Sequence, residues 1–257
     1  MSELEPSDIP AVKPAFQRAV LDRNMTVNPT PVRDAIRDLD LTGLAILDFG
    51  CGNGNLLRLL KETKADIVYA FEIVPGGIDA DIRAWANDPA AKPKLVINPP
   101  AFKIDPAAPD GDLTNYDYFA LLARHEKFGI IANPPYFLYN RILSLTGTNL
   151  APGDEKFAAF REKFAGALMI TSKGRLHNHP GWEIKTVMKP DDFDPPAGND
   201  QYLIQTGFGK IFNEAAAIHE APPPQKYVSI NNRDADADET DHYPEMWEQV
   251  NALRPAI

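Results

Sequence analysis

Short apolar runs alternate with helix-like stretches along most of this 257-residue chain. Six runs have the length and composition of β-strands: residues 44–49, 67–71, 95–97, 128–132, 182–188 and 202–206. A helix is expected before the first run, at residues 30–39, with Thr30 as N-cap and Pro31 in its first turn, and further helices are expected between runs, at residues 55–60 and 116–124. This order predicts an α/β domain built around one core.

The apolar run from Phe128 stops abruptly at Asn133-Pro134-Pro135-Tyr136. A proline has no N–H to donate, so two in succession end the strand at Asn133. In open α/β sheets, ligands bind in the crevice beyond the carboxyl ends of the strands. The Asn133 amide oxygen and the Pro134 carbonyl are two acceptors, and Tyr136 offers a flat face. Together they suit a flipped-out base that bears an exocyclic amine.

The tetrapeptide could also have no functional role and simply end the strand. The chain contains 24 prolines and a second Asn-Pro-Pro at residues 98–100, so the tripeptide is not specific. Tyr136 is what distinguishes the first copy from the second.

A glycine-rich loop, Gly50-Cys51-Gly52-Asn53-Gly54, joins the strand at 44–49 to the helix that Asn55 opens. Glycines let a backbone turn tightly and let a ligand approach it. Glu72 ends the next strand, 22 residues after Gly50, where a carboxylate would accept both hydroxyls of a ribose. A dinucleotide fingerprint would need glycine at position 55, where this chain has asparagine.

With Asp48 before the loop and Glu72 after it, the set resembles the cofactor site of class I S-adenosylmethionine (SAM)-dependent methyltransferases. The resemblance implies a Rossmann-like, seven-stranded, mostly parallel sheet whose last strand is antiparallel, with SAM as cofactor. It implies these cofactor-binding residues: Asp48, Gly50, Cys51, Gly52, Asn53, Gly54, Glu72 and Asn98. Asn98 stands where the family commonly has an acidic residue that faces the adenine.

The Asn-Pro-Pro-Tyr motif resembles that of methyltransferases acting on exocyclic amines. Three further stretches resemble the rRNA adenine N6-dimethyltransferases more than they resemble restriction-associated enzymes: residues 137–143, 167–176 and 187–196. The fifth strand is expected at the start of 167–176. The resemblance implies a nucleic-acid substrate and assigns Asn133, Pro134, Pro135 and Tyr136 to catalysis. It assigns Phe137, Lys173 and Arg175 to substrate binding.

Two departures leave RNA and DNA open as substrates. The rRNA enzymes usually carry Leu or Ile where this chain has Pro134, whereas Asn-Pro-Pro-Tyr is commoner in DNA adenine enzymes and in glutamine methyltransferases of release factors. The rRNA enzymes also end in a helical RNA-contacting domain, and only about 50 residues follow Phe208. A protein glutamine N5-methyltransferase and a non-catalytic binding protein that keeps the SAM fold are the alternative functions.

The charge balance limits how a nucleic acid would be bound. Lys and Arg number 26 against 36 Asp and Glu, a formal net charge of −10, so a cationic contact surface must be local. Residues 144–166, an insertion with Lys156, Arg161 and Lys163, would supply part of it or would be a solvated helix face. The expected domains are a flexible arm at 1–15, the methyltransferase domain at 16–212 and a Pro-rich, acidic tail at 213–257.

Other classes of site find little support. The single cysteine, Cys51, excludes an internal disulfide framework, and His177 with His179 lacks a third partner for a metal, so no metal is expected. No apolar run reaches the length of a membrane span and no signal-like segment opens the chain, so a cytoplasmic protein is expected. The sequence carries no signal for the oligomeric state.

Overall fold

A computed structural model describes residues 29–73, 75–108, 110–113, 115–133, 155, 162–172, 182–194, 196–197 and 200–206. The helices are α2 (Thr30–Arg37), α3 (Asn55–Lys61), α4 (Ala80–Asn87) and α5 (Tyr118–Ala123). Short 3₁₀ turns lie at Pro75–Gly77, Pro100–Phe102 and Pro190–Asp192. The strands are β1 (Ala45–Phe49), β2 (Ile67–Phe71), β3 (Lys94–Ile97), β4 (Phe128–Ala132), β5 (Phe164–Ser172), β6 (Trp182–Met188) and β7 (Gln201–Thr206).

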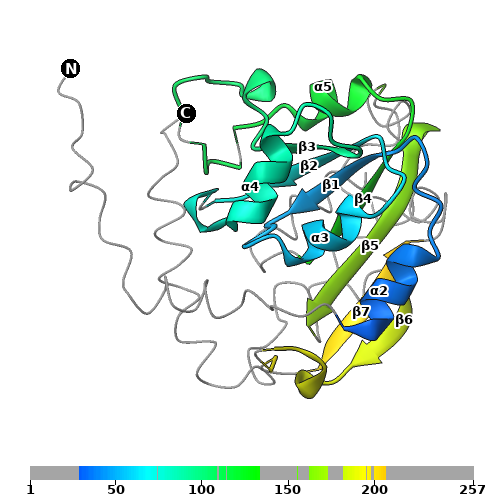
Figure 1. Ribbon diagram of the computed structural model, residues 1–257. Helices are drawn as coiled ribbons and strands as arrows, with labels where there is room; N and C mark the ends of the chain where they lie inside the picture. Colours follow the sequence, from blue (N-terminus) through cyan, green and yellow to red (C-terminus); the bar gives the residue numbers. More distant parts are fainter. Residues whose placement is uncertain are drawn as a thin grey trace, which may run out of the picture. The chain divides into compact units, whose positions relative to one another are not determined.

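Within the described residues the seven strands form one sheet in the order β3-β2-β1-β4-β5-β7-β6 (Figure 1). All pairs from β3 to β5 are parallel, whereas β7 runs antiparallel to both β5 and β6. Six strands thus share one direction and the last strand in the chain opposes them. The fold class expected from the sequence is confirmed.

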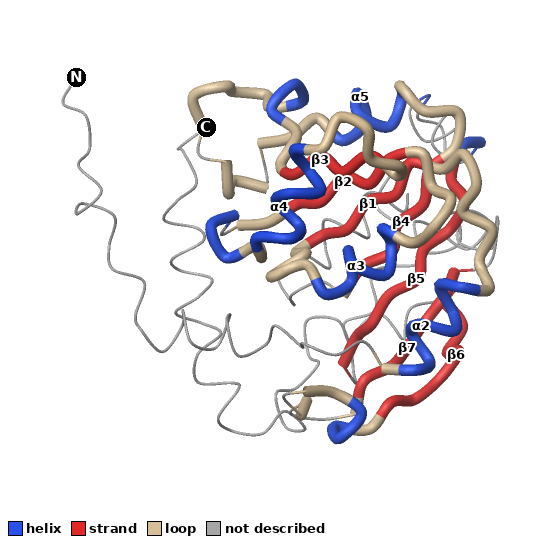
Figure 2. The backbone as a smooth tube through the Cα atoms, in the orientation of Figure 1, coloured by secondary structure: helices blue, strands red, loops and turns tan. Residues whose placement is uncertain are grey.

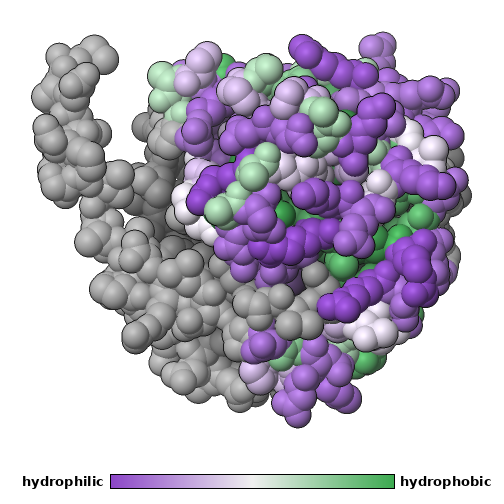
Figure 3. All heavy atoms as spheres, in the orientation of Figure 1, coloured by the Kyte–Doolittle hydropathy of each residue, from purple (hydrophilic) through white to green (hydrophobic). Residues whose placement is uncertain are grey.

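Helices cover both faces of the sheet (Figure 2). Leu47 and Phe49 of β1 pack with Leu121 and Leu122 of α5 on one face. Ile46 points to the other face, where the buried residues of α2, α3 and α4 pack: Val32, Ile36, Leu56, Leu57, Leu60, Ile82 and Trp85. The central strands are buried on both faces, which is why their sequences are continuous apolar runs rather than alternating ones. Figure 3 shows that the outer surface over α3 and α4 is mostly hydrophilic.

Several element boundaries differ from those expected. Helix α2 has Pro29 rather than Thr30 as its N-cap and ends at Arg37, before Leu39. Helix α5 begins two residues later than expected because Asp117 caps it, its carboxylate accepting the Ala120 N–H at 2.9 Å.

Strand β5 begins at Phe164, so the last three residues of the expected insertion at 144–166 belong to the sheet. Helix α4 is an element that the sequence pattern does not predict. The described part of the chain contains no helix that is long and apolar enough to span a membrane.

Candidate active site

Three polar residues predicted to act in a site follow or end neighbouring strands. Asp48 is the fourth residue of β1, Glu72 follows β2, and Asn133 follows β4. Leu47 of β1 pairs with Ile130 of β4, so the carboxyl ends of these two parallel strands lie side by side. The sheet order reverses between β1 and β4, because β2 and β3 lie on one side of β1 and β5 lies beyond β4. Crevices at such switch points are where open α/β sheets bind ligands.

The glycine loop turns back over the end of β2. Gly50, Gly52 and Gly54 all have positive φ, at 70°, 56° and 102°. The Gly50 N–H donates to the Phe71 carbonyl at 2.8 Å, and the Cys51 N–H donates to the same oxygen at 3.2 Å. Residues other than glycine rarely adopt these angles, so the spacing of the glycines sets the path of the loop.

Glu72 lies against this loop. Its side chain is buried at 7% exposure, and its Oε2 accepts the Gly52 N–H at 2.7 Å. A carboxylate has about four acceptor positions, so it can accept more than one donor. The arrangement brings the predicted ribose-binding residue and the predicted cofactor loop into contact.

Asp48 is a buried carboxylate beside Glu72. Its exposure is 1%, and within the described part of the chain neither carboxylate oxygen has a hydrogen-bond partner. Burial, and then the charge of Glu72, raises the pKa of Asp48 well above its ordinary value. Burying a polar group without a partner is costly, so a cationic ligand group at this place would relieve that cost.

Cys51 is buried near Asp48 and Glu72. Burial, and then the charges of Asp48 and Glu72, raises the pKa of its thiol well above the ordinary value. The thiol is therefore protonated at neutral pH and is not a nucleophile. Its neighbour Asn53 joins the loop to the start of α4, with its carbonyl accepting the Asp79 N–H at 3.1 Å.

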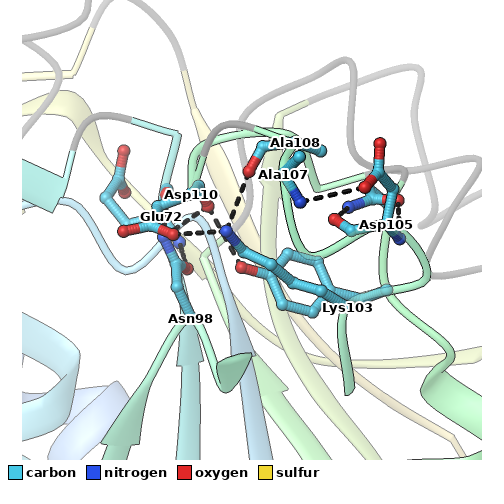
Figure 4. A network of polar contacts seen from close by, with 9 residues as sticks. Glu72, Asn98, Lys103, Asp105, Ala107, Ala108 and Asp110 are labelled. Atoms are coloured by element: carbon cyan, nitrogen blue, oxygen red, sulfur yellow. Dashed lines mark hydrogen bonds and ion pairs between the residues drawn. The ribbon is translucent and has the colours of Figure 1, made fainter. Parts of the chain in front are cut away.

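Asn98 follows β3 directly and points at the backbone of Glu72 (Figure 4). Its Oδ1 accepts the Glu72 N–H at 2.8 Å, and its Nδ2 donates to the Glu72 carbonyl at 2.7 Å. The same Nδ2 also donates to the Asp110 carbonyl at 2.8 Å. Asn98 is 5% exposed and has a φ of 42°, a left-handed conformation that asparagine tolerates better than most residues. The described bonds of this amide are thus made to backbone groups.

The segment from Lys103 to Tyr116 packs beside Glu72, which no pattern in the sequence indicates. Lys103 donates through Nζ to the Ala108 carbonyl at 2.8 Å and pairs with Asp110 at 2.5 Å (Figure 4). Lys103 and Tyr116 also form an isolated antiparallel bridge. A Cβ on Gly111 would overlap the carbonyl oxygen of Ile73, the residue after Glu72. The segment therefore lies directly against the end of β2.

Comparisons with known proteins give structural neighbours but no sequence relatives. No family model matches the chain, and no curated protein matches it either. The solved structure of the 23S rRNA methyltransferase ErmE is similar, with 14% identity, a TM-score of 0.48 and coverage of 81% of each chain. A dimethyladenosine transferase from Plasmodium falciparum has 16% identity and a TM-score of 0.43 over 71% of this chain and 62% of its own.

A third neighbour is TrmK of M. capricolum in complex with S-adenosyl-homocysteine (SAH), its natural cofactor product. It has 11% identity and a TM-score of 0.44 over 89% of this chain and all of its own. These values reach no further than the fold. The assignment of fold class stands on the strand order itself.

The remaining predicted site residues lie outside the described part of the chain: Pro134, Pro135, Tyr136, Phe137, Lys173 and Arg175. So do Lys156, Arg161, the arm at 1–15 and the tail at 213–257. Lys163 is described, and its Nζ donates to the Ala123 carbonyl at 3.3 Å. Among the described residues no group of three His, Cys, Asp or Glu side chains could hold a metal.

Proposed function

We propose that this chain is a SAM-dependent methyltransferase that modifies the exocyclic N6 amine of adenine in RNA or DNA. One observation carries the proposal. The glycine loop after β1 donates its Gly52 N–H to Glu72 at the end of β2, and the unpartnered Asp48 carboxylate is buried next to them. A loop of three positive-φ glycines, a ribose-type carboxylate and a buried carboxyl group fit a ligand with a ribose and a cationic amino acid end.

Each residue of the cofactor part has a distinct task in this proposal. SAM supplies a methyl group on a sulfonium, which an amine can accept without further activation of the methyl donor. Glu72 accepts the ribose hydroxyls, and Gly50 to Gly54 leave space for the ligand to pass close to the backbone. Asp48 pairs with the cationic amino group of the methionine end.

Asn133 is proposed to hold the substrate amine. It follows β4 directly, beside the strand that leads into the glycine loop, so an amine bound there would lie near the cofactor loop. The Asn133 amide oxygen and the Pro134 carbonyl accept the two amine hydrogens, which draws the nitrogen lone pair out of conjugation with the ring. Tyr136 stacks on the base. Catalysis then comes mainly from orientation: a nitrogen–carbon bond would form as the sulfur–methyl bond breaks, and the methylated amine would lose its extra proton to solvent.

A second candidate is a protein glutamine N5-methyltransferase. The spelling Asn133-Pro134-Pro135-Tyr136 favours it, because the same two acceptors can hold a side-chain amide. The net charge of −10 also suits a protein substrate. The continuation at 137–143, which resembles the rRNA enzymes, favours the nucleic-acid proposal instead.

Two substitutions separate cofactor binding from transfer. Glu72→Ala should weaken SAM binding about tenfold or more, because a charge-assisted hydrogen bond to a ribose hydroxyl contributes about 1.5–3 kcal/mol. Asn133→Ala should leave SAM binding near wild type and abolish methyl transfer. Calorimetry measures the first quantity and labelled-methyl incorporation measures the second.

The exposed Asn87 at the end of α4 offers a matched control, since Asn87→Ala should change neither quantity. Unchanged SAM affinity in Glu72→Ala would remove this residue from the cofactor site. Near-normal turnover in Asn133→Ala would contradict the proposed chemistry.

A further inference from the structure

We infer that Asn98 is a positioning residue, which fixes the ribose-binding carboxylate of Glu72 and fastens the segment from Lys103 to Tyr116 against it. The inference rests on the proposed function, because it assigns Glu72 to the ribose of the cofactor. It gives Asn98 a task other than contact with the adenine.

The backbone of Glu72 needs such a partner. Strand β2 ends at Phe71, and the last pair between β2 and β3 joins Ala70 to Ile97, so Glu72 lies beyond that ladder. Its N–H and carbonyl are met by the two ends of the Asn98 amide, at 2.8 and 2.7 Å. A buried backbone group without a partner costs as much as a lost hydrogen bond. The Asn98 side chain therefore sets where the Glu72 backbone lies and, through it, where the carboxylate lies.

The second arm of Asn98 reaches the segment that packs on Glu72. Its Nδ2 donates to the Asp110 carbonyl, which also accepts the Tyr116 hydroxyl at 3.1 Å. Burial, and then the charges of Asp110 and Asp112, raises the pKa of Tyr116 to about 12, so this hydroxyl remains a donor at neutral pH. Lys103, only 6% exposed, pairs with the Asp110 carboxylate. Asn98 thus joins the end of β2 to a segment that has its own internal bonds.

An aspartate cannot replace this asparagine. The carboxylate in Asn98→Asp would keep an acceptor for the Glu72 N–H but would face the carbonyls of Glu72 and Asp110 with oxygens instead of an NH₂ group. It would also add a negative charge beside Glu72. The change Asn98→Gly would keep the φ of 42° without strain and would remove the amide without adding charge.

The chain offers a matched control in the same segment. Asn115 makes the same pair of bonds to one acidic residue: its Oδ1 accepts the Asp105 N–H at 2.9 Å and its Nδ2 donates to the Asp105 carbonyl at 2.8 Å. Asn115→Asp therefore breaks an equivalent bond in the segment without touching Glu72.

The test compares two ligands by calorimetry: SAH, and SAH whose ribose lacks the 2′ and 3′ hydroxyls. Wild-type protein and Asn115→Asp should bind SAH about tenfold or more tightly than the analogue, because only SAH bonds to Glu72. Asn98→Asp and Asn98→Gly should bind SAH about tenfold more weakly and should lose most of that preference. A general loss of structure would weaken both ligands equally and preserve the ratio, and thermal melting of each variant checks that it is folded.

The outcomes separate this inference from the proposed function. If wild type binds neither ligand, the proposed function fails. If wild type prefers SAH and folded Asn98→Asp and Asn98→Gly keep the full preference, the proposed function stands and the positioning role of Asn98 is overturned. A preference lost equally in Asn115→Asp would also overturn it, since any break in the segment would then suffice.

Discussion

At the scale of single residues, Asp48 is the group whose burial opposes folding. Its carboxylate is fully buried, and no described residue bonds to it. Because burial raises its pKa, the ionised form opposes folding at every pH above its ordinary value of 3.8. In the proposed function, the cationic amino group of the ligand would remove this penalty.

The isosteric change Asp48→Asn should therefore raise the stability of the ligand-free protein while weakening SAM binding. Near pH 3.8 the wild-type carboxyl is protonated in the folded state, so the two proteins should differ least. As pH rises from there toward the raised folded pKa, wild type should lose stability relative to the variant. Thermal melting from about pH 4 to about pH 8 measures this difference, and a wild type that gains on the variant with rising pH would contradict the account.

The sequence is enough to predict that the glycine loop and Glu72 lie at neighbouring strand ends, which the bond from the Gly52 N–H to Glu72 bears out. The assignment of SAM to these residues rests on the family resemblance and stays a prediction. Gly50, Gly52 and Gly54 are predictable as a loop because they follow an apolar strand run directly. Glu72 is predictable as its neighbour because it follows the next strand run. The bonds of Asn98 are not predictable, since they depend on its left-handed φ and on the return of the chain at Asp110. In sequence, Asn98 is recognisable only as the start of a second Asn-Pro-Pro and by its place at the end of the third strand.

At the scale of elements, the contact between Gly54 and α4 sets where helix α3 begins relative to α4. A Cβ on Gly54 would lie 2.5 Å from Cγ1 of Ile82, a buried residue of α4, and Gly54 precedes α3 at a φ of 102°. Arg58 of α3 also pairs with Asp79 and Asp81 at the start of α4, at 2.7 and 2.8 Å. These ion pairs are partly exposed and contribute little to stability, so the packing at Gly54 contributes more to holding α3 against α4.

Gly54→Ala should destabilise the protein by about 2–4 kcal/mol, because it combines a left-handed alanine with overpacking against Ile82. Gly43→Ala is the matched control: Gly43 has a φ of 74°, and a Cβ added there would meet nothing within 4 Å. Only the backbone strain of about 1 kcal/mol therefore applies to the control. Urea denaturation compares the two. Equal losses would show that close packing against α4 does not constrain the loop.

Helix α4 could not be predicted from the sequence pattern. Its buried apolar face consists of Ile82 and Trp85, three residues apart, which is too short a signal to identify a helix before the fold is known. Strand ends are predicted closely where prolines or glycines stop the ladder, as at Asn133 and Gly50. Helix ends shift by one or two residues where the cap differs from the residue expected.

At the scale of the whole molecule, the sheet order brings together residues that are far apart in the chain. Asp48, Glu72 and Asn133 are separated by up to 85 positions (133 − 48), yet each lies at the carboxyl end of one of three adjacent strands. The alternation of strand and helix patterns predicts an α/β domain, and the resemblance to class I methyltransferases implies the mostly parallel sheet that the structure shows. The net charge of −10 indicates only that a nucleic acid would be bound through a small cationic surface. It does not distinguish RNA from DNA.

The most direct test of the central claim is transfer of a labelled methyl group from SAM to three separate pools: double-stranded DNA, total RNA with ribosomal subunits, and a protein lysate. Digestion and mass spectrometry of each labelled product identify the methylated group, with Asn133→Ala as the inactive control. We predict N6-methyladenine or N6-dimethyladenine in RNA or DNA. Label in protein glutamine, or no label in any pool despite SAM binding, would contradict the account.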